Sequence, residues 1–221
     1  RPSAHATTDL TKFRLPMPEV EKLPNGLTVA WFVDDKLPVI DLALLEQTGT
    51  RSDPKGKSGT VEMTARLLER GAHGISAENM AHRVESLGAS GFASADEEGI
   101  TVGMHGLSQD ADSLLEMVAW IVREPNFLAS EFRRDRTQLA DSWRHLTDSA
   151  DTVAGYVFGK LVLNGTVYAR GALDDARKLS RVKLEDVRAF HRANFVPSNS
   201  VLVVVGRVDR PAFRNRIISL F

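Results

Sequence analysis

Residues 59–71, GTVEMTARLLERG, have the pattern of one amphipathic helix that ends at a glycine. Val61, Ala65 and Leu68 recur at helical spacing on one face, while the opposite face carries charged side chains. Glu62 and Arg66 stand four residues apart on this charged face. Their order is the better one for a helix ion pair, which contributes roughly 0.3–0.5 kcal/mol. The stretch therefore predicts a helix packed on a core, with an ion pair on its outer side.

The charged face of this helix lacks the residues of a zinc site. One large class of zinc hydrolases places two histidines at positions i and i+4 of a helix, with a catalytic glutamate between them. Here Glu62 and Arg66 occupy the i and i+4 positions, and Ala65 stands between them. A guanidinium is a permanent cation with no acceptor atom, so it cannot bind a metal ion. We interpret this face as structural.

Strand patterns precede the helix. Residues 19–35, EVEKLPNGLTVAWFVDD, predict a hairpin around Asn25 and Gly26, a favoured pair for a tight turn. A third strand is expected at 39–47, followed by a loop at 48–59 that is rich in Gly, Ser and Pro. After the helix, a second helix is expected at 77–87, with strands at 89–96 and 98–107.

The second half of the sequence is mostly helical. Helices are expected at 109–123, 129–147, 150–162, 173–179, 184–195 and 210–221. Residues 200–208, SVLVVVGRV, form a nearly unbroken apolar run and predict a central buried strand. Strands and helices occur in separate blocks, which favours an α+β fold with a mostly antiparallel sheet and helices packed on one face. Residues 1–14 are expected to be a mobile arm, and residues 15–221 a single domain.

Composition excludes several classes of protein. The chain has 221 residues, a formal net charge of -1 and no cysteine, so disulfides, thiol nucleophiles and Cys–zinc sites are excluded. The balanced charge gives no reason to expect nucleic acid or an anionic membrane as a partner. No run of 18 apolar residues could span a membrane. The chain opens with RPSAHATTD, which resembles the start of a trimmed chain and favours a periplasmic or exported location over a cytoplasmic one.

The strand expected at 89–96 is the candidate binding element. Its small side chains would let another backbone approach, so an extended peptide could add to this edge through main-chain hydrogen bonds. A plain edge strand explains the same pattern, and both interpretations stay open. The residues that would contact a peptide are Ser90, Gly91, Phe92, Ala93 and Ser94.

Several stretches, taken in order, resemble the insulinase/pitrilysin family of zinc peptidases, which includes mitochondrial-processing-peptidase-like members. They are LPNGLTVAWF, GTRSDP, GTVEMTARLLERG, MAHRVESLGASGFASAD, EFRRDRTQLAD, VRAFHRANFVPSN and VLVVVGRVD. The resemblance covers residues 19–221. It implies a fold built from two tandem units of about this size, of which this chain would be the first.

The resemblance also implies where a metal site would lie. The two histidines of H-x-x-E-H fall on Glu62 and Arg66, and the general base falls on Ala65. The family's third ligand, a glutamate on the long helix, falls on Ser142, or on Asp141 if the alignment shifts by one residue. All these positions have lost their catalytic residues, so we expect no catalysis and no cofactor here, with zinc only in a catalytic partner.

Three functions follow from this comparison. The first is a non-catalytic pseudo-peptidase unit that helps form a chamber for extended peptide, beside a homologous subunit with H-x-x-E-H or in a homo-oligomer. The second is a structural, core-type subunit of a larger complex with no proteolytic role. The third is a hydrolase that uses other residues, such as His82, Glu85 or His105, although their spacing supports no metal site.

Overall fold

The computed structural model describes residues 17–169 and 178–221. The predicted arm at 1–14 and most of the helix expected at 173–179 lie outside these ranges. The described strands form a six-stranded sheet in the order β1-β2-β8-β3-β7-β6. In chain order they are β1 (Glu19–Lys22), β2 (Thr28–Val33), β3 (Val39–Glu46), β6 (Ser90–Ala95), β7 (Ile100–Leu107) and β8 (Ser200–Gly206). A separate two-stranded hairpin, β4 (Gly71–Ala72) with β5 (Ile75–Ser76), was not predicted because its strands are too short to show a periodicity.

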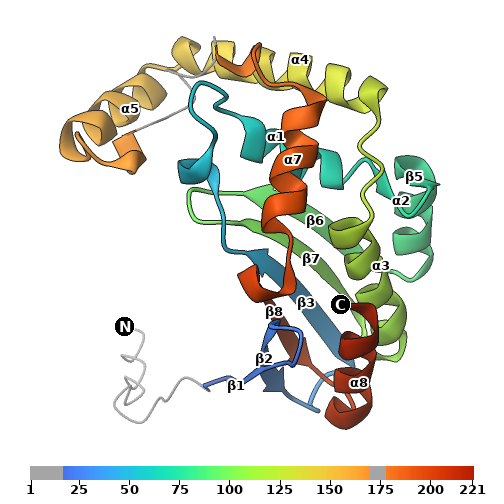
Figure 1. Cartoon of the computed structure of the whole chain (residues 1–221). Coiled ribbons are helices and arrows are strands. Elements are labelled where there is room, and N and C mark those ends of the chain that lie inside the picture. The colour runs from blue at the N-terminus through green and yellow to red at the C-terminus, as the bar shows by residue number, and fades with distance from the viewer. Residues whose placement is uncertain (1–16, 170–177) are drawn as a thin grey trace, which may run out of the picture.

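The helices agree closely with the predicted ranges. They are α1 (Thr60–Leu68), α2 (Ala77–Ser86), α3 (Ala111–Arg123), α4 (Ala129–His145), α5 (Ala150–Val162), α7 (Leu184–Asn194) and α8 (Arg210–Leu220). Figure 1 shows α4 and α5 extending along one end of the molecule, beyond the sheet. Among the described helices, none combines the length and apolar character that a membrane span requires.

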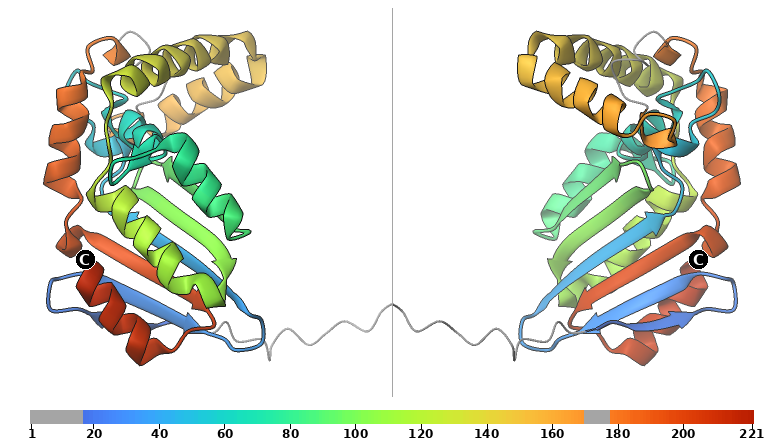
Figure 2. Two further views of the ribbon diagram at one scale, coloured as in Figure 1. Left: turned by 90° about the vertical axis from the view of Figure 1, so that its right-hand side faces the viewer. Right: turned by 90° about the vertical axis from the view of Figure 1, so that its left-hand side faces the viewer.

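The sheet is covered by helices on one face, as the α+β prediction requires. In Figure 2, α3 and α8 lie across that face, while the described helices leave the opposite face open. Strand β3 shows the alternation: Ile40, Leu42 and Leu44 are buried beneath the helices, and the residues between them are more exposed. The hydrophobic core therefore lies between one face of the sheet and the helix layer.

Strand β8 joins the two halves of the sheet. It runs parallel to β2 and antiparallel to β3, so the prediction of a central strand is confirmed. The expectation that it is buried throughout is only half right. Leu202 and Val204 are buried, whereas Val205 on the open face is 37% exposed. The apolar run is nearly continuous because β8 also carries valines, Val201, Val203 and Val205, on its more exposed face.

A buried ion pair holds α1 against α4. Asp135 of α4 is fully buried, and Arg70, just beyond the end of α1, donates from its Nε to the Asp135 Oδ2 at 2.7 Å. Arg134 adds a longer contact of 3.4 Å to the same carboxylate. A carboxylate in the interior needs such partners, because an unpaired buried charge is strongly destabilising.

A second buried carboxylate lies where β3 meets β8. Burial raises the pKa of Glu46 to about 7, although Ser200 hydrogen-bonds to it. The Ser200 Oγ lies 2.6 Å from Glu46 Oε1 and 2.8 Å from the Val196 carbonyl oxygen. One hydroxyl has only one hydrogen. When Ser200 donates to Val196, a protonated Glu46 can donate to Ser200, and both contacts are satisfied.

We expect Arg70→Met to lower the free energy of unfolding by about 3 kcal/mol, because it leaves the buried Asp135 carboxylate with only its weaker partner. Urea denaturation would measure the loss. Arg66→Met on the same helix is the matched control, and it should cost no more than roughly 0.5 kcal/mol because its ion pair is partly exposed. Equal losses in the two variants would contradict the assignment.

Glu46 should make stability depend on pH. Its pKa is about 7 in the folded state, whereas an unperturbed glutamate has a pKa of 4.5, so between these pH values the folded state keeps a proton that the unfolded state has lost. The free energy of unfolding should therefore fall as pH rises through this window, by about 3 kcal/mol from this group. Glu46→Gln should remove that slope in denaturation measured from pH 4.5 to 7.5. Glu78→Gln, an exposed control on α2, should keep it.

Candidate functional site

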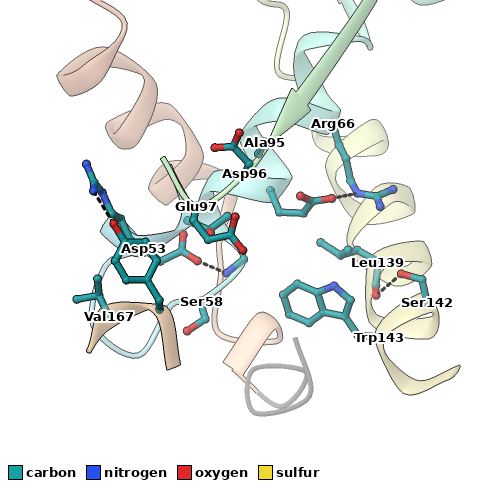
Figure 3. Close-up of a pocket in the computed structure, with 15 residues that line it drawn as sticks. Asp53, Ser58, Arg66, Ala95, Asp96, Glu97, Leu139, Ser142, Trp143 and Val167 are labelled. Atoms are coloured by element: carbon teal, nitrogen blue, oxygen red, sulfur yellow. Dashed lines mark hydrogen bonds and ion pairs between the residues drawn. The ribbon is translucent and has the colours of Figure 1, made fainter. Parts of the chain in front are cut away.

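A cavity of about 390 Å³ opens between α1, α4 and the turn that joins β6 to β7. Figure 3 shows Arg66 of α1, Ser142 and Trp143 of α4, and Glu97 of the turn around it. The residues that line the cavity are Thr50, Arg51, Asp53, Ser58, Gly59, Glu62, Arg66, Ala95, Asp96, Glu97, Leu139, Ser142, Trp143, Val167 and Tyr168. The structure thus brings Glu62, Arg66 and Ser142 to one site, although Ser142 follows Arg66 by a long stretch of sequence.

The α1 wall of the cavity carries the expected ion pair. Arg66 donates from its Nε to Glu62 Oε1 at 3.0 Å, one helical turn away. The rest of α1 is buried, including Met63, Leu67 and Leu68. Because one side of the helix is fixed in the core, Glu62 and Arg66 are held facing the cavity.

The α4 wall offers a hydroxyl and an aromatic ring. The Ser142 hydroxyl donates to the Leu139 carbonyl oxygen at 2.9 Å, within its own helix. The Trp143 ring packs over Gly59, where a Cβ would lie 2.9 Å from the ring. Gly59 also has a φ of +94°, so glycine is required both by the conformation and by the close approach of the ring.

The start of α1 is capped by the side chain of Asp53, because Gly59 at the N-cap position has no side chain that could do so. Its two carboxylate oxygens accept from the backbone N–H groups of Gly59 at 2.7 Å and Val61 at 2.9 Å. These donors would otherwise have no partner in the first turn of the helix. Sequence reasoning missed Asp53 because it stands six residues before Gly59, outside the usual capping spacing.

A small polar cluster borders the cavity on the side of the β6–β7 turn. Arg51 Nη1 lies 2.6 Å from Glu98 Oε2 and donates to the Tyr168 hydroxyl at 3.2 Å. Tyr168 in turn donates to Glu98 at 2.5 Å. Three segments distant in sequence therefore meet at this border. The sequence predicted no role for Glu98, Arg51 or Tyr168, because local patterns do not show that these segments meet.

The other predicted site residues lie elsewhere. Ala65 is buried and does not line the cavity, and Asp141 pairs with Arg144 at 2.6 Å. His105 contacts Asp41 at 2.7 Å on the open face of the sheet, and His82 lies 3.8 Å from Glu85 on α2. Within the described ranges, no three His, Asp or Glu side chains come together as a set that could hold a metal ion.

Strand β6 is an edge strand, as the sequence predicted. Within the described sheet it pairs only with β7, and most of its side chains are exposed. A second hollow of about 340 Å³ lies between β6 and α2, lined by Leu68, Glu69, Ala77, Met80, Ala81, Val84, Glu85, Ala89, Ser90, Gly91, Phe92, Ala93, Met104 and Ile121. Both hollows are bordered by α1 and β6, so β6 runs from one to the other.

Known proteins with related sequences include proteases and subunits of the cytochrome b-c1 complex. The chain is 26% identical over 202 residues to zinc protease PqqE of Helicobacter pylori, covering 88% of this chain and 44% of that protein. It is 25% identical over 181 residues to cytochrome b-c1 complex subunit 1 of Bos taurus, covering 80% of this chain and 37% of that protein. The chain thus spans less than half the length of these curated relatives.

Solved structures share the fold. An inactive domain of peptidase M16 from Pseudomonas fluorescens superposes with a TM-score of 0.84 at 22% identity, covering 92% of this chain and 50% of that one. A protease from Helicobacter pylori gives 0.85 at 24% identity, covering 94% of this chain and 50% of that one. The sequence pattern of the insulinase family, peptidase family M16, matches residues 31–161, and the chain belongs to that family.

Proposed function

We propose that this chain is a non-catalytic unit of a zinc-peptidase assembly. It would help form a chamber that binds extended peptide, while a homologous partner with H-x-x-E-H supplies catalysis. The observation that carries the proposal is the Glu62–Arg66 ion pair in the cavity between α1 and α4. The similarity to an inactive domain of the same family supports it.

The residues of the cavity do not suit zinc, which the name of the relative zinc protease PqqE implies for that protein. A zinc site needs neutral imidazole, thiolate or carboxylate donors converging on one point. Arg66 offers only hydrogen-bond donors and a fixed positive charge, and it already engages Glu62. The Ser142 hydroxyl is used within α4. We therefore assign no metal-dependent step to this chain, and we propose Glu62, Ala65, Arg66 and Ser142 as the altered family positions.

The peptide would lie along β6. Within the described sheet this strand pairs with another strand on one side only, and it connects the two hollows, so an extended segment could hydrogen-bond to its outer side and place side chains in both. Ser90, Gly91, Phe92, Ala93 and Ser94 are then the contact residues, as the sequence suggested. We further propose that residues 15–221 act as the first of two units, since the chain covers about half of the matched structures.

A structural role is the second candidate. The similarity to cytochrome b-c1 complex subunit 1 favours it, because that relative is named as a subunit of a complex and not as a protease. The two candidates differ in the partner they require. A peptidase partner supports the first, and a stable complex without peptidase activity supports the second.

The placement of Ser142 can be tested by rebuilding a metal site. We expect Glu62→His with Arg66→His to bind zinc weakly, since only two ligands are present, and Ser142→Glu added to this pair to tighten binding at least about tenfold by supplying a third. Isothermal titration with zinc measures both. Gln138→Glu in the same background adds the same charge to α4, and an equal gain from it would refute the placement.

The pseudo-peptidase role can be tested by reconstitution. The tagged chain should be inactive against unfolded casein by itself. It should bind a homologous subunit that carries H-x-x-E-H and raise the activity of that subunit on mixing. Mass spectrometry of the bound material identifies the partner, and the peptidase assay measures the gain. Chelator-sensitive hydrolysis by the isolated chain would overturn the proposal.

A further inference from the structure

The outer edge of β6 is already occupied at its centre. The backbone N–H of Ala93 donates to Glu69 Oε1 at 3.0 Å. Ala93 faces Val102 of β7 in a pair whose main-chain groups do not hydrogen-bond to each other, so the Ala93 N–H points away from β7. Because this direction alternates along a strand, the N–H and C=O groups of Gly91 and Ala95 also point away from β7. Glu69 therefore takes the central hydrogen-bond donor that an added strand would use.

Glu69 is held at this edge by helix α1. It follows Leu68, the last residue of α1, and Leu68 is fully buried. The carboxylate itself is exposed, so water can replace its contact with Ala93 and the side chain can swing away. Glu69 thus covers the edge without closing it permanently.

The hollow beside this edge has a distinct chemical character. Its floor is apolar, with Met80, Met104 and Ile121, and among the described residues its only charged lining side chains are those of Glu69 and Glu85. No Lys or Arg from residues 17–169 or 178–221 lines it. An extended segment places alternate side chains on one face, so residues i and i+2 would both point into this hollow. Charge complementarity favours a segment with an apolar and a basic residue at those two positions.

We propose that Glu69 selects the peptides that can extend the sheet at β6. A peptide must displace the Glu69 carboxylate from the Ala93 N–H, and a Lys or Arg side chain facing the hollow compensates by pairing with the released carboxylate. The incoming strand then accepts the freed hydrogen bond from Ala93. Peptides without a basic residue at that position leave Glu69 on Ala93 and bind less well. The inference rests on the proposed peptide-binding role of β6.

Two variants separate the charge of Glu69 from its hydrogen bond. Glu69→Gln keeps an oxygen that can accept from Ala93 but removes the charge, whereas Glu69→Ala removes both. Glu78→Ala on α2 removes a carboxylate that does not line the hollow and serves as the control. The first probe is a positional-scanning library of short fluorescein-labelled peptides with valine at alternate positions. The best binder is then made in two versions, with Lys or Gln at the position that faces the hollow.

Fluorescence anisotropy should show that wild type and Glu78→Ala bind the Lys peptide roughly fivefold more tightly than the Gln peptide. Both Glu69 variants should bind the two peptides within about twofold of each other. Glu69→Ala should also bind the Gln peptide more tightly than wild type does. Amide exchange at Ala93 should be faster in Glu69→Ala than in Glu69→Gln, and bound peptide should slow it again.

Two results would count against the inference. Peptide binding with the same Lys preference in all variants would overturn the role of Glu69 and leave the proposed peptide chamber in place. A library that binds neither wild type nor Glu69→Ala would overturn the peptide-binding role itself, and the inference with it.

Discussion

The burial of α1 is the constraint on which the site depends. This short helix is fixed between the sheet and α4 by Met63, Leu67 and Leu68, and its two ends are held by Asp53 and by the ion pair just beyond its last turn. A helix fixed in this way cannot turn about its own axis, so each of its faces keeps one direction. Its outward residues therefore face the cavity at one end and the edge of β6 at the other.

The same constraint separates the part of α1 that the fold requires from the part that it leaves free to vary. The apolar stripe of α1 is needed for the core, and large-to-small changes there cost several kcal/mol. The charged face has no such requirement, because an ion pair of two partly exposed side chains contributes little. Residues on that face, where Glu62 and Arg66 form their ion pair, can therefore change while the helix stays in place.

Local sequence patterns were enough to predict most helices and strands. They failed to predict pairings and contacts between residues that are distant in sequence. Helix α5 occupies the predicted residues 150–162, and the Asn25–Gly26 hairpin forms as expected. The parallel pairing of β8 with β2 could not be predicted, since nothing in either strand specifies its neighbour.

At the candidate site, the Glu62–Arg66 pair followed from helix spacing alone. The contact between Glu69 and Ala93 did not, because it depends on how the end of α1 meets an edge strand. The sequence also did not predict that Asp53 caps the start of α1, because the loop between them folds so that Asp53 contacts the helix. In each case the information lies in tertiary geometry rather than in periodicity.

The position of β8 also governs how the chain must fold. Glu46 and Ser200, at facing ends of β3 and β8, are 154 residues apart, so the sheet closes only through a contact of very high sequence separation. Such topologies have high contact order and fold slowly. On a ribosome, β2 and β3 would emerge with apolar, unpaired edges long before β8 is available, which makes the nascent chain prone to aggregate and a natural client for chaperones.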